Sequence, residues 1–167
     1  MVPGDPSSAA FLVAAALIVP GSEVTIEGVL VNPTRTGFYV TLRRWAPTSP
    51  SATSARRAAS RWPTSACGTR ELNGVRVPPE RAPSMIDEYP VLACLAAYAA
   101  GETRMEGLAE LKVKESDRLA ATAAGLAANG VPAKVDGDTL IVGGRRAACA
   151  AAARSPPTST TASPWPS

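Results

Sequence analysis

The stretch that decides the fold is residues 87–107, which read DEYPVLACLAAYAAGETRMEG. After two acidic residues, an apolar run predicts a helix from about Tyr89 to Ala100. Pro90 suits the first turn of that helix, where its missing amide hydrogen would have no helical partner. Gly101 stops the helix, and Thr103 to Leu111 can form a strand. The pattern therefore predicts alternating α/β structure.

A further helix and a hairpin are expected after this stretch. Ser116 or Asp117 starts a helix that ends at Asn129-Gly130, because a polar residue caps the first turn and a glycine suits the end. Two short alternating runs, 133–135 and 139–142, flank an Asp-Gly-Asp turn and should pair as a hairpin. Residues 71–144 are therefore expected to form one βαβαββ-type unit.

Residues 1–44 follow a similar plan. The apolar run Ala9 to Val19 predicts a helix, and Glu23 to Val31 alternates like a strand. A second helix is expected from about Thr36 to Arg44. The run GSEVTIEG at 21–28 resembles GETRMEG at 101–107, which indicates an internal repeat. Residues 1–44 are therefore interpreted as a partial βαβα unit.

Composition excludes several classes of function. The chain has no histidine, so a Ser-His-Asp triad, a Cys-His pair and a histidine-bound metal are excluded. Its three widely spaced cysteines do not suggest a disulfide framework or a zinc site, and a reducing cytoplasm fits best. The apolar run of the first helix is too short to cross a membrane. We expect a protein without a metal or cofactor that is not bound to a membrane.

The basic charge of the chain is unevenly placed. Its pI is about 9.0, which at first suggests nucleic acid as a partner. Seven arginines, however, lie in segments 45–70 and 145–167, which contain no acidic residue. The rest of the chain keeps 10 basic against 14 acidic residues, as the total is 17 Lys+Arg and 14 Asp+Glu. We therefore do not expect a nucleic-acid-binding face.

Two motifs lie at expected helix starts. Ser7 and Ser8 open the first helix, where they can be ordinary caps or can bind an anion together with the helix amides. Lys114 and Arg118 lie one turn apart beside Glu115 at the start of a later helix. This second run can be a solvated helix entry, but two like charges at this spacing repel each other unless an anion lies between them.

Four short runs of the chain stand out together: GDPSS at 4–8, NPTRTG at 32–37, RAPSMIDEYP at 81–90 and KVKESDRL at 112–119. In these runs the sequence resembles 5-enolpyruvylshikimate-3-phosphate (EPSP) synthase, and most of all the bacterial class noted for glyphosate tolerance. The resemblance covers about residues 1–44 and 71–144. It implies an α/β fold, namely part of the inside-out α/β barrel of the enolpyruvyl transferases, built from βαβαββ units whose helices begin at the interdomain cleft.

The resemblance also implies one set of residues for shikimate 3-phosphate. Ser7 and Ser8 would bind this substrate, and Arg35 would hold its phosphate with its fork of donors. Asp87 would accept the proton of the attacking hydroxyl group. Glu88 can support the site or merely face solvent.

A second set of residues would act on phosphoenolpyruvate. Lys114 and Arg118 would hold its phosphate and carboxylate, and Glu115 would handle protons at its reacting carbon. The family chemistry is general acid–base catalysis through a tetrahedral adduct, with cations that stabilise charge and no metal. Glyphosate is an expected inhibitor of this site.

Segments 45–70 and 145–167 depart from the family. With GC-rich codons, the family run Met-Gly-Ala-Asp-Ile shifted by one base encodes Trp-Ala-Pro-Thr-Ser, which is 45–49. The same shift turns Val-Ala-Asp-Leu-Arg-Val into residues 62–67 and Val-Ala-Thr-His-Leu-Asp-His-Arg-Ile-Ala-Met into residues 155–165. We interpret both segments as out of frame, as a linker and a tail, and their composition predicts disorder.

Three functions remain open at this point. The first is EPSP synthase, with weak or no turnover by this chain alone because the family's first half is absent. The second is UDP-N-acetylglucosamine enolpyruvyl transferase, although the Lys-Glu-Ser-Asp-Arg run favours the shikimate enzyme. The third is a non-catalytic fragment that binds an anion or complements a broken synthase.

Overall fold

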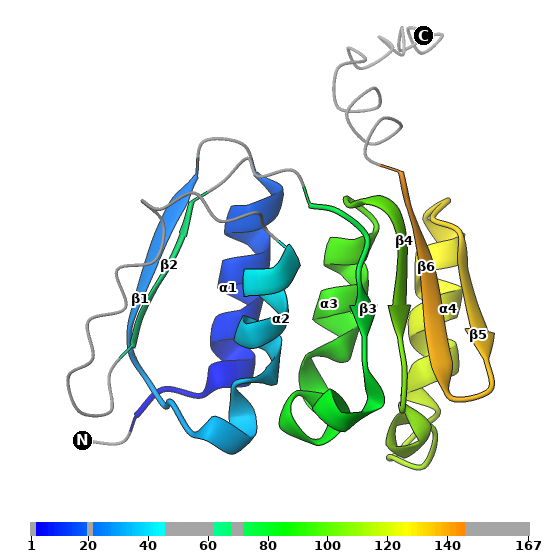
Figure 1. Cartoon of the computed structure of the whole chain (residues 1–167), viewed down its shortest axis with the longest axis horizontal. Coiled ribbons are helices and arrows are strands. Elements are labelled where there is room, and N and C mark those ends of the chain that lie inside the picture. Colours follow the sequence, from blue (N-terminus) through cyan, green and yellow to red (C-terminus); the bar gives the residue numbers. More distant parts are fainter. Residues whose placement is uncertain (1–2, 20–21, 46–61, 68–71, 146–167) are drawn as a thin grey trace, which may run out of the picture.

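The computed structural model describes residues 3–19, 22–45, 62–67 and 72–145 (Figure 1). The elements of its N-terminal half are α1 (Pro6–Ile18), β1 (Glu23–Val29), η1 (Pro33–Arg35), α2 (Gly37–Trp45) and β2 (Trp62–Cys67). The elements of its C-terminal half are β3 (Arg76–Val77), η2 (Pro79–Ser84), η3 (Ile86–Glu88), α3 (Tyr89–Ala96), β4 (Ala100–Met105), η4 (Ala109–Lys112), α4 (Arg118–Ala128), β5 (Ala133–Asp136) and β6 (Thr139–Arg145). The elements marked η are 3₁₀-helices.

In the N-terminal half, α1 connects two segments that pair in parallel. Gly4 donates its amide hydrogen to the carbonyl of Gly28 at 2.8 Å and accepts from the amide of Leu30 at 2.9 Å. Gly28 adopts a positive φ of 71°, which a residue with a side chain rarely adopts. β1 then pairs antiparallel with β2, from Glu23 opposite Cys67 to Val29 opposite Trp62.

The C-terminal half repeats this arrangement with a larger sheet. β3 and β4 pair in parallel across α3, and β4 pairs antiparallel with β6. The β5–β6 hairpin completes a four-stranded sheet in the order β3-β4-β6-β5. In Figure 1, α3 and α4 lie on the same face of this sheet. Each half therefore has a helix that connects two parallel segments, and a further strand that pairs antiparallel with the second segment. This repetition agrees with the internal repeat in the sequence.

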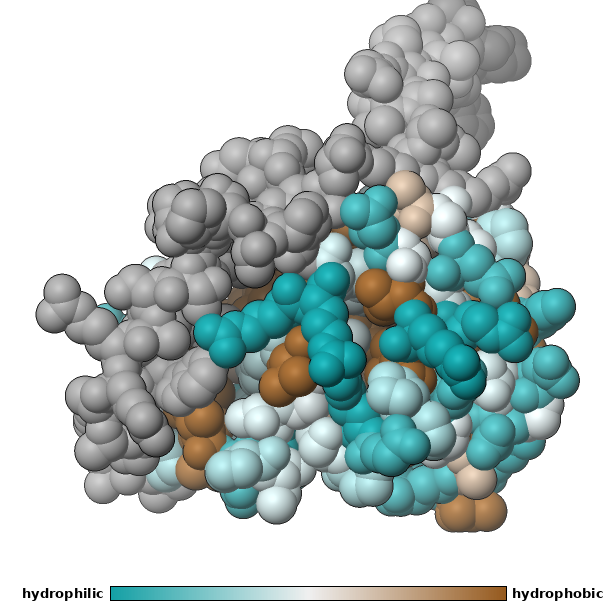
Figure 2. All heavy atoms as spheres, in the orientation of Figure 1, coloured by the Kyte–Doolittle hydropathy of each residue, from teal (hydrophilic) through white to brown (hydrophobic). Residues whose placement is uncertain are grey.

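One apolar core joins the two halves. α1 and α3 contact each other, and alanines on both helices, Ala10 and Ala93 among them, are fully buried. Small side chains allow helix backbones to approach closely, so the core needs few aromatic residues. Phe38, Trp45 and Tyr89 are the largest of its fully buried side chains. Where Figure 2 is not grey, the surface that it shows is largely hydrophilic, with apolar side chains visible between hydrophilic ones.

Two boundaries near the decisive stretch were predicted wrongly. The helix expected to reach Ala100 ends at Ala96, and the strand expected over residues 103–111 runs from Ala100 to Met105. Ala100 donates its amide hydrogen to Leu72 at 2.7 Å and accepts from Gly74 at 2.6 Å. These backbone hydrogen bonds place Ala100 in the sheet, although alanine favours helices.

The prediction that segment 45–70 contains no regular structure is wrong in two places. Trp45 is the last residue of α2 and is 1% exposed, because it extends the buried face formed by Phe38 and Thr41 at helical spacing. Trp62–Cys67 forms β2, since strand pairing is made by backbone groups, and the register with β1 is irregular between Thr64 and Trp62, on either side of Pro63. Residues 46–61 and 68–70 lie outside the described residues.

The tail prediction falls mostly outside the described residues. Arg145, which was assigned to the tail, ends β6 and lies opposite Ala100. Residues 146–167 are not described. Within the described part of the chain, no helix is both long and apolar enough to cross a lipid bilayer.

Candidate functional site

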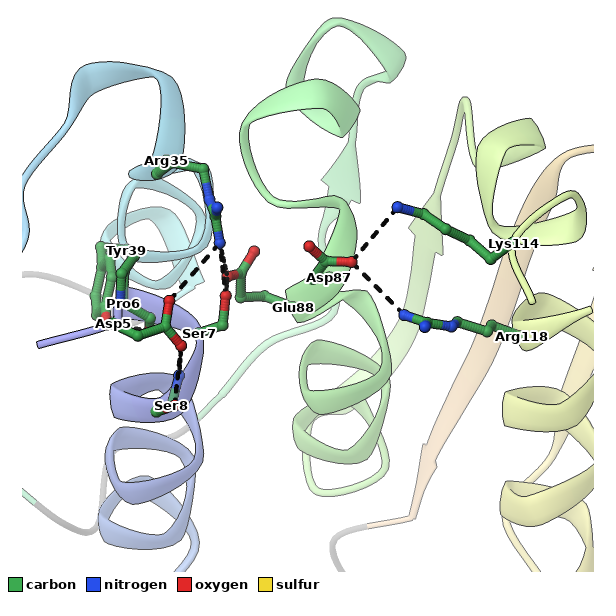
Figure 3. Close-up of polar contacts among 10 residues, drawn as sticks. All are labelled: Asp5, Pro6, Ser7, Ser8, Arg35, Tyr39, Asp87, Glu88, Lys114 and Arg118. Atoms are coloured by element: carbon green, nitrogen blue, oxygen red, sulfur yellow. Dashed lines mark hydrogen bonds and ion pairs between the residues drawn. The ribbon is translucent and has the colours of Figure 1, made fainter. Parts of the chain in front are cut away.

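The predicted site residues come from four segments that begin or precede helices: the first turn of α1, η1, η3 and the chain before α4 (Figure 3). They form two groups. We call Asp5, Ser7, Arg35 and Glu88 the Arg35 cluster. We call Asp87, Lys114, Glu115 and Arg118 the Asp87 cluster.

In the Arg35 cluster, a chain of hydrogen bonds runs from Arg35 through Ser7 to Glu88. The NH2 group of Arg35 donates to Ser7 Oγ at 2.8 Å, and Ser7 Oγ donates to Glu88 Oε1. Arg35 NH2 also lies 3.7 Å from Glu88 Oε1 and 4.0 Å from Asp5 Oδ1. The structure therefore brings Ser7 and Arg35 together and adds two carboxylates.

Glu88 is buried, so the alternative that it merely faces solvent is wrong. Its side chain is 2% exposed, and its second oxygen, Oε2, has no hydrogen-bond partner. The only sequence signal for this role was its position beside Asp87 before a helix. That signal could not distinguish an inward from an outward carboxylate.

The cap of α1 is Asp5 rather than Ser7 or Ser8. The amide and hydroxyl groups of Ser8 donate to Asp5 Oδ2 at 2.8 and 2.9 Å. The amide of Ser8 and then its hydroxyl lower the pKa of the Asp5 carboxyl below its usual value. Ser8 is exposed and lies beside the Arg35 cluster, but its hydroxyl hydrogen is directed to Asp5.

Tyr39 also contributes to this cluster, and sequence reasoning missed it. Its hydroxyl group donates to the carbonyl of Pro6 at 2.9 Å, which ties α2 to the start of α1. Burial, and next the charges of Glu88 and Asp5, raise the pKa of Tyr39 to about 12. The hydroxyl therefore stays protonated at neutral pH and keeps donating this hydrogen bond.

In the Asp87 cluster, two cations converge on one carboxylate. Lys114 Nζ lies 3.7 Å and Arg118 NH1 lies 3.6 Å from Asp87 Oδ1. The sequence predicted that an anion would lie between these cations, and in this structure the Asp87 carboxylate takes that position. Lys114 also pairs with Glu110 at 3.2 Å.

Glu115 lies at the exposed edge of the Asp87 cluster. Its side chain is 77% exposed and accepts a hydrogen bond from Arg118 NH2. A hydrogen bond from its own backbone amide, and next one from Arg118, lower the pKa of the Glu115 carboxyl. Near neutral pH this group is therefore ionised and can accept a proton.

The two clusters are connected through adjacent residues. Asp87 and Glu88 both belong to η3, and Figure 3 shows their side chains pointing in opposite directions, one toward each cluster. Asp117, next to the second cluster, caps α4 by accepting from the amide of Ala120 at 2.9 Å. The first turn of α1, the turn before α3 and the segment from Lys114 to the start of α4 thus carry the predicted site residues except Arg35, which η1 supplies.

Comparison with known proteins identifies the family. A sequence model of EPSP synthase (3-phosphoshikimate 1-carboxyvinyltransferase) matches residues 1–156. The chain belongs to the EPSP synthase family. The shikimate enzyme, and not the UDP-N-acetylglucosamine alternative, is therefore the family that the chain matches. The matched range includes residues 45–70, and the interpretation of that segment as out of frame remains a prediction.

Several curated relatives carry the same name. The 3-phosphoshikimate 1-carboxyvinyltransferase of Methylobacterium sp. (strain 4-46) is 57% identical over 144 residues, which are 86% of this chain and 32% of the relative. The enzyme of Acidiphilium cryptum is 58% identical over 145 residues, with the same coverage. The chain thus spans about a third of the length of the curated relatives that it matches.

Solved structures agree with the fold. The EPSP synthase of Acinetobacter baumannii superposes with a TM-score of 0.77 at 39% identity, over 86% of this chain and 33% of that protein. The enolpyruvyl transferase NikO of Streptomyces tendae gives a TM-score of 0.56 at 19% identity, over 86% of this chain and 30% of that protein, and supports the fold alone. The expected α/β enolpyruvyl transferase fold is therefore confirmed.

Proposed function

We propose that this chain forms part of the substrate-binding surface of a 3-phosphoshikimate 1-carboxyvinyltransferase, which transfers an enolpyruvyl group from phosphoenolpyruvate to shikimate 3-phosphate. The observation that carries the proposal is the convergence of Lys114 and Arg118 on the Asp87 carboxylate, at 3.7 and 3.6 Å. Lys114 and Arg118 both lie beside one carboxylate. Their N–H groups that do not face Asp87 can donate to a phosphate or a carboxylate of a ligand. This geometry supports phosphoenolpyruvate as the ligand of the Asp87 cluster.

The acid–base roles follow from the same cluster. Asp87 accepts the proton of the attacking shikimate hydroxyl, and Lys114 and Arg118 balance the charge of the phosphate and carboxylate. Glu115 gives a proton to the methylene carbon of phosphoenolpyruvate when the adduct forms and takes one back when phosphate leaves. Its lowered pKa supports the second of these steps, because a base must be ionised before it acts.

The Arg35 cluster is proposed to bind shikimate 3-phosphate. Arg35 uses one hydrogen bond on Ser7 and its side chain is 40% exposed, so most of its donors can reach a phosphate. Ser7 and Ser8 complete this site. Both hydroxyl hydrogens point to carboxylates in this structure, so each must turn before it can donate to the ligand.

We expect this 167-residue polypeptide to bind its substrates more readily than it turns them over. Each charge-assisted contact can contribute about 1.5–3 kcal/mol to binding. Turnover requires both substrates to be enclosed and dehydrated, and such positioning supplies about 7–11 kcal/mol of a barrier. Binding without turnover, or turnover only with a complementing synthase fragment as partner, is therefore the expected behaviour.

Two finer expectations depend on this function. Glyphosate carries a carboxylate and a phosphonate, and we propose that it competes with phosphoenolpyruvate for Lys114 and Arg118. The proposed place of action is the cytoplasm.

The test is calorimetric titration of each substrate into the parent chain and into Arg118→Ala and Arg35→Ala, together with a phosphate-release assay. Arg118→Ala should weaken phosphoenolpyruvate binding by about tenfold or more, and Arg35→Ala should do the same for shikimate 3-phosphate. Arg76→Ala is the matched control, because Arg76 pairs with Glu106 outside both clusters. Binding that neither site change affects would remove the proposed sites. Phosphate release that disappears in Asp87→Asn would show that the chain alone is a synthase.

A further inference from the structure

Glu88 is a buried acidic residue that is only partly hydrogen-bonded. Its carboxylate is 2% exposed, and its Oε2 atom is buried without a hydrogen-bond partner. Burial of an ionisable group costs free energy unless the group is fully paired. Glu88 is buried although this is unfavourable, and it lies next to Ser7 and Arg35, which are proposed to bind substrate. This position suggests that Glu88 does more than pack.

The geometry around Ser7 indicates what that role is. Ser7 Oγ has one hydrogen, which it donates to Glu88 Oε1, so it faces Arg35 with a lone pair and accepts from NH2 at 2.8 Å. A guanidinium group has no acceptor, so Ser7 Oγ can only accept from Arg35 and its own hydrogen must point elsewhere. Glu88 Oε1 takes that hydrogen, which fixes the rotation of the Ser7 hydroxyl group and keeps a lone pair directed at Arg35.

The position of Arg35 depends on this chain of hydrogen bonds. Its other acidic neighbour, Asp5, is 52% exposed and 4.0 Å away, and an exposed pair at that distance contributes little. Glu88 Oε1 instead lies 3.7 Å away in a buried position, and it is linked to the guanidinium group through the Ser7 hydroxyl. A guanidinium held by one edge keeps its remaining donors free for a ligand.

We propose that Glu88 is a positioning residue, which acts through Ser7 to hold the Arg35 guanidinium in the orientation that receives the phosphate group of the substrate. The proposal deepens the function given above and rests on it for the identity of the ligand. The two neighbouring acids of η3 then have different partners. Asp87 lies against Lys114 in the Asp87 cluster, whereas Glu88 acts on Arg35.

The first test needs no ligand. In the full chain, the nuclear magnetic resonance signal of the Arg35 Nε–H group reports how well the guanidinium is ordered. We expect a rigid group in the parent and in Glu88→Gln, whose amide oxygen can still accept from Ser7. Glu88→Ala and Ser7→Ala should both mobilise Arg35, because each removes one member of the hydrogen-bond chain.

The second test measures substrate affinity in the same variants. Glu88→Ala should weaken shikimate 3-phosphate binding by about tenfold and leave phosphoenolpyruvate binding unchanged, whereas Glu88→Gln should stay within about threefold of the parent for both ligands. Glu106→Ala is the control, because it also removes the carboxylate of an arginine pair, here with Arg76 at 2.7 Å. It should affect neither ligand.

The outcomes separate this proposal from the function on which it rests. An Arg35 signal as rigid in Glu88→Ala and Ser7→Ala as in the parent would overturn the positioning role, whatever binds. If Glu88→Ala does not fold, Ser7→Ala alone decides, because it keeps the buried carboxylate and breaks the same chain. Mobile Arg35 in these variants, combined with binding that Arg35→Ala does not change, would leave the positioning role intact and reject the proposed ligand.

Discussion

Polar residues at the start of α1 have separate roles that their positions alone do not reveal. Asp5 caps the helix, Ser8 donates to Asp5, and Ser7 points away from both toward Glu88. A change at one position should therefore have a specific consequence. Loss of the cap should affect stability, whereas loss of Ser7 should affect the order of Arg35.

We predict that Asp5→Ala lowers the free energy of unfolding by about 0.5–2 kcal/mol at neutral pH, as is usual for the loss of an N-cap. The pKa of Asp5 is lowered in the folded state from its ordinary value of 3.8, first by the amide of Ser8. The ionised carboxylate therefore stabilises the fold above pH 3.8, and this contribution is lost as the pH falls through the lowered pKa. Chemical denaturation at several pH values measures the difference between parent and variant.

Asp5→Asn is the matched control for this prediction, because asparagine also caps helices but cannot ionise. It should keep most of the free energy of unfolding at neutral pH. The contribution of its cap should not change as the pH falls, because the asparagine side chain does not titrate. An Asp5→Ala deficit that stays constant from neutral pH to below pH 3 would contradict the assigned cause.

At the scale of single elements, the effect of a Gly→Ala substitution on stability depends on the atoms around that glycine. Gly125 lies in the exposed face of α4, and a Cβ atom at this position would meet nothing within 4 Å. Gly74 lies against β4, and its Cβ atom would come within 2.2 Å of the carbonyl oxygen of Glu102. The same substitution should therefore have opposite effects at the two positions.

We predict that Gly125→Ala stabilises the chain by about 0.5–1 kcal/mol, because alanine restricts the unfolded chain and favours the helix. Gly74→Ala should destabilise it by about 1–3 kcal/mol, because the backbone of β4 must shift. Thermal denaturation of both variants gives the comparison. Equal melting temperatures would indicate that Gly74 does not approach β4 as closely as described.

The pairing of β2 with β1 is a second prediction at this scale. We expect slow amide exchange for the paired amides of Trp62–Cys67, in the register that places Cys67 opposite Glu23. Protection should be weaker than in β4 and β6, since β6 pairs on both sides, with β4 and β5. Fast amide exchange throughout β2 would contradict its pairing with β1 and support the disorder that the composition of this segment predicts.

At the scale of the whole molecule, the two halves are unequal. Residues 72–145 contain a four-stranded sheet covered by two helices, whereas the described part of the N-terminal half has a two-stranded ribbon packed beside α1. A two-stranded ribbon is marginal by itself and depends on the helices that cover it. The stability of the N-terminal half should therefore depend on contact between α1 and α3.

We predict that limited proteolysis trims the chain toward residues 72–145, where helix caps, turns and strand pairing agree with one another. Mass spectrometry of the digest identifies the protected range. If cleavage within residues 89–130 comes first, α3 and α4 are not the stable centre of the molecule.

The sequence by itself determined the local features of the fold. Asp117 before α4, the Asp-Gly-Asp turn between β5 and β6, and the glycine that follows α4 are signals that act within a few residues. Four short motifs also sufficed to predict the family, which the comparisons confirm. Except for Asp5, the residues of both clusters were named from these motifs, although their roles remain predictions.

Only the tertiary structure decided which of these groups contact each other. Ser7 and Glu88 are 81 residues apart in the chain, and their hydrogen bond exists because α1 packs against the start of α3. The same packing buries Glu88 while Asp87, its neighbour, turns toward Lys114 and Arg118. Periodicity and capping depend on nearby residues, whereas burial and ion pairing depend on how distant elements pack. The sequence pattern could therefore identify the charges but not their partners.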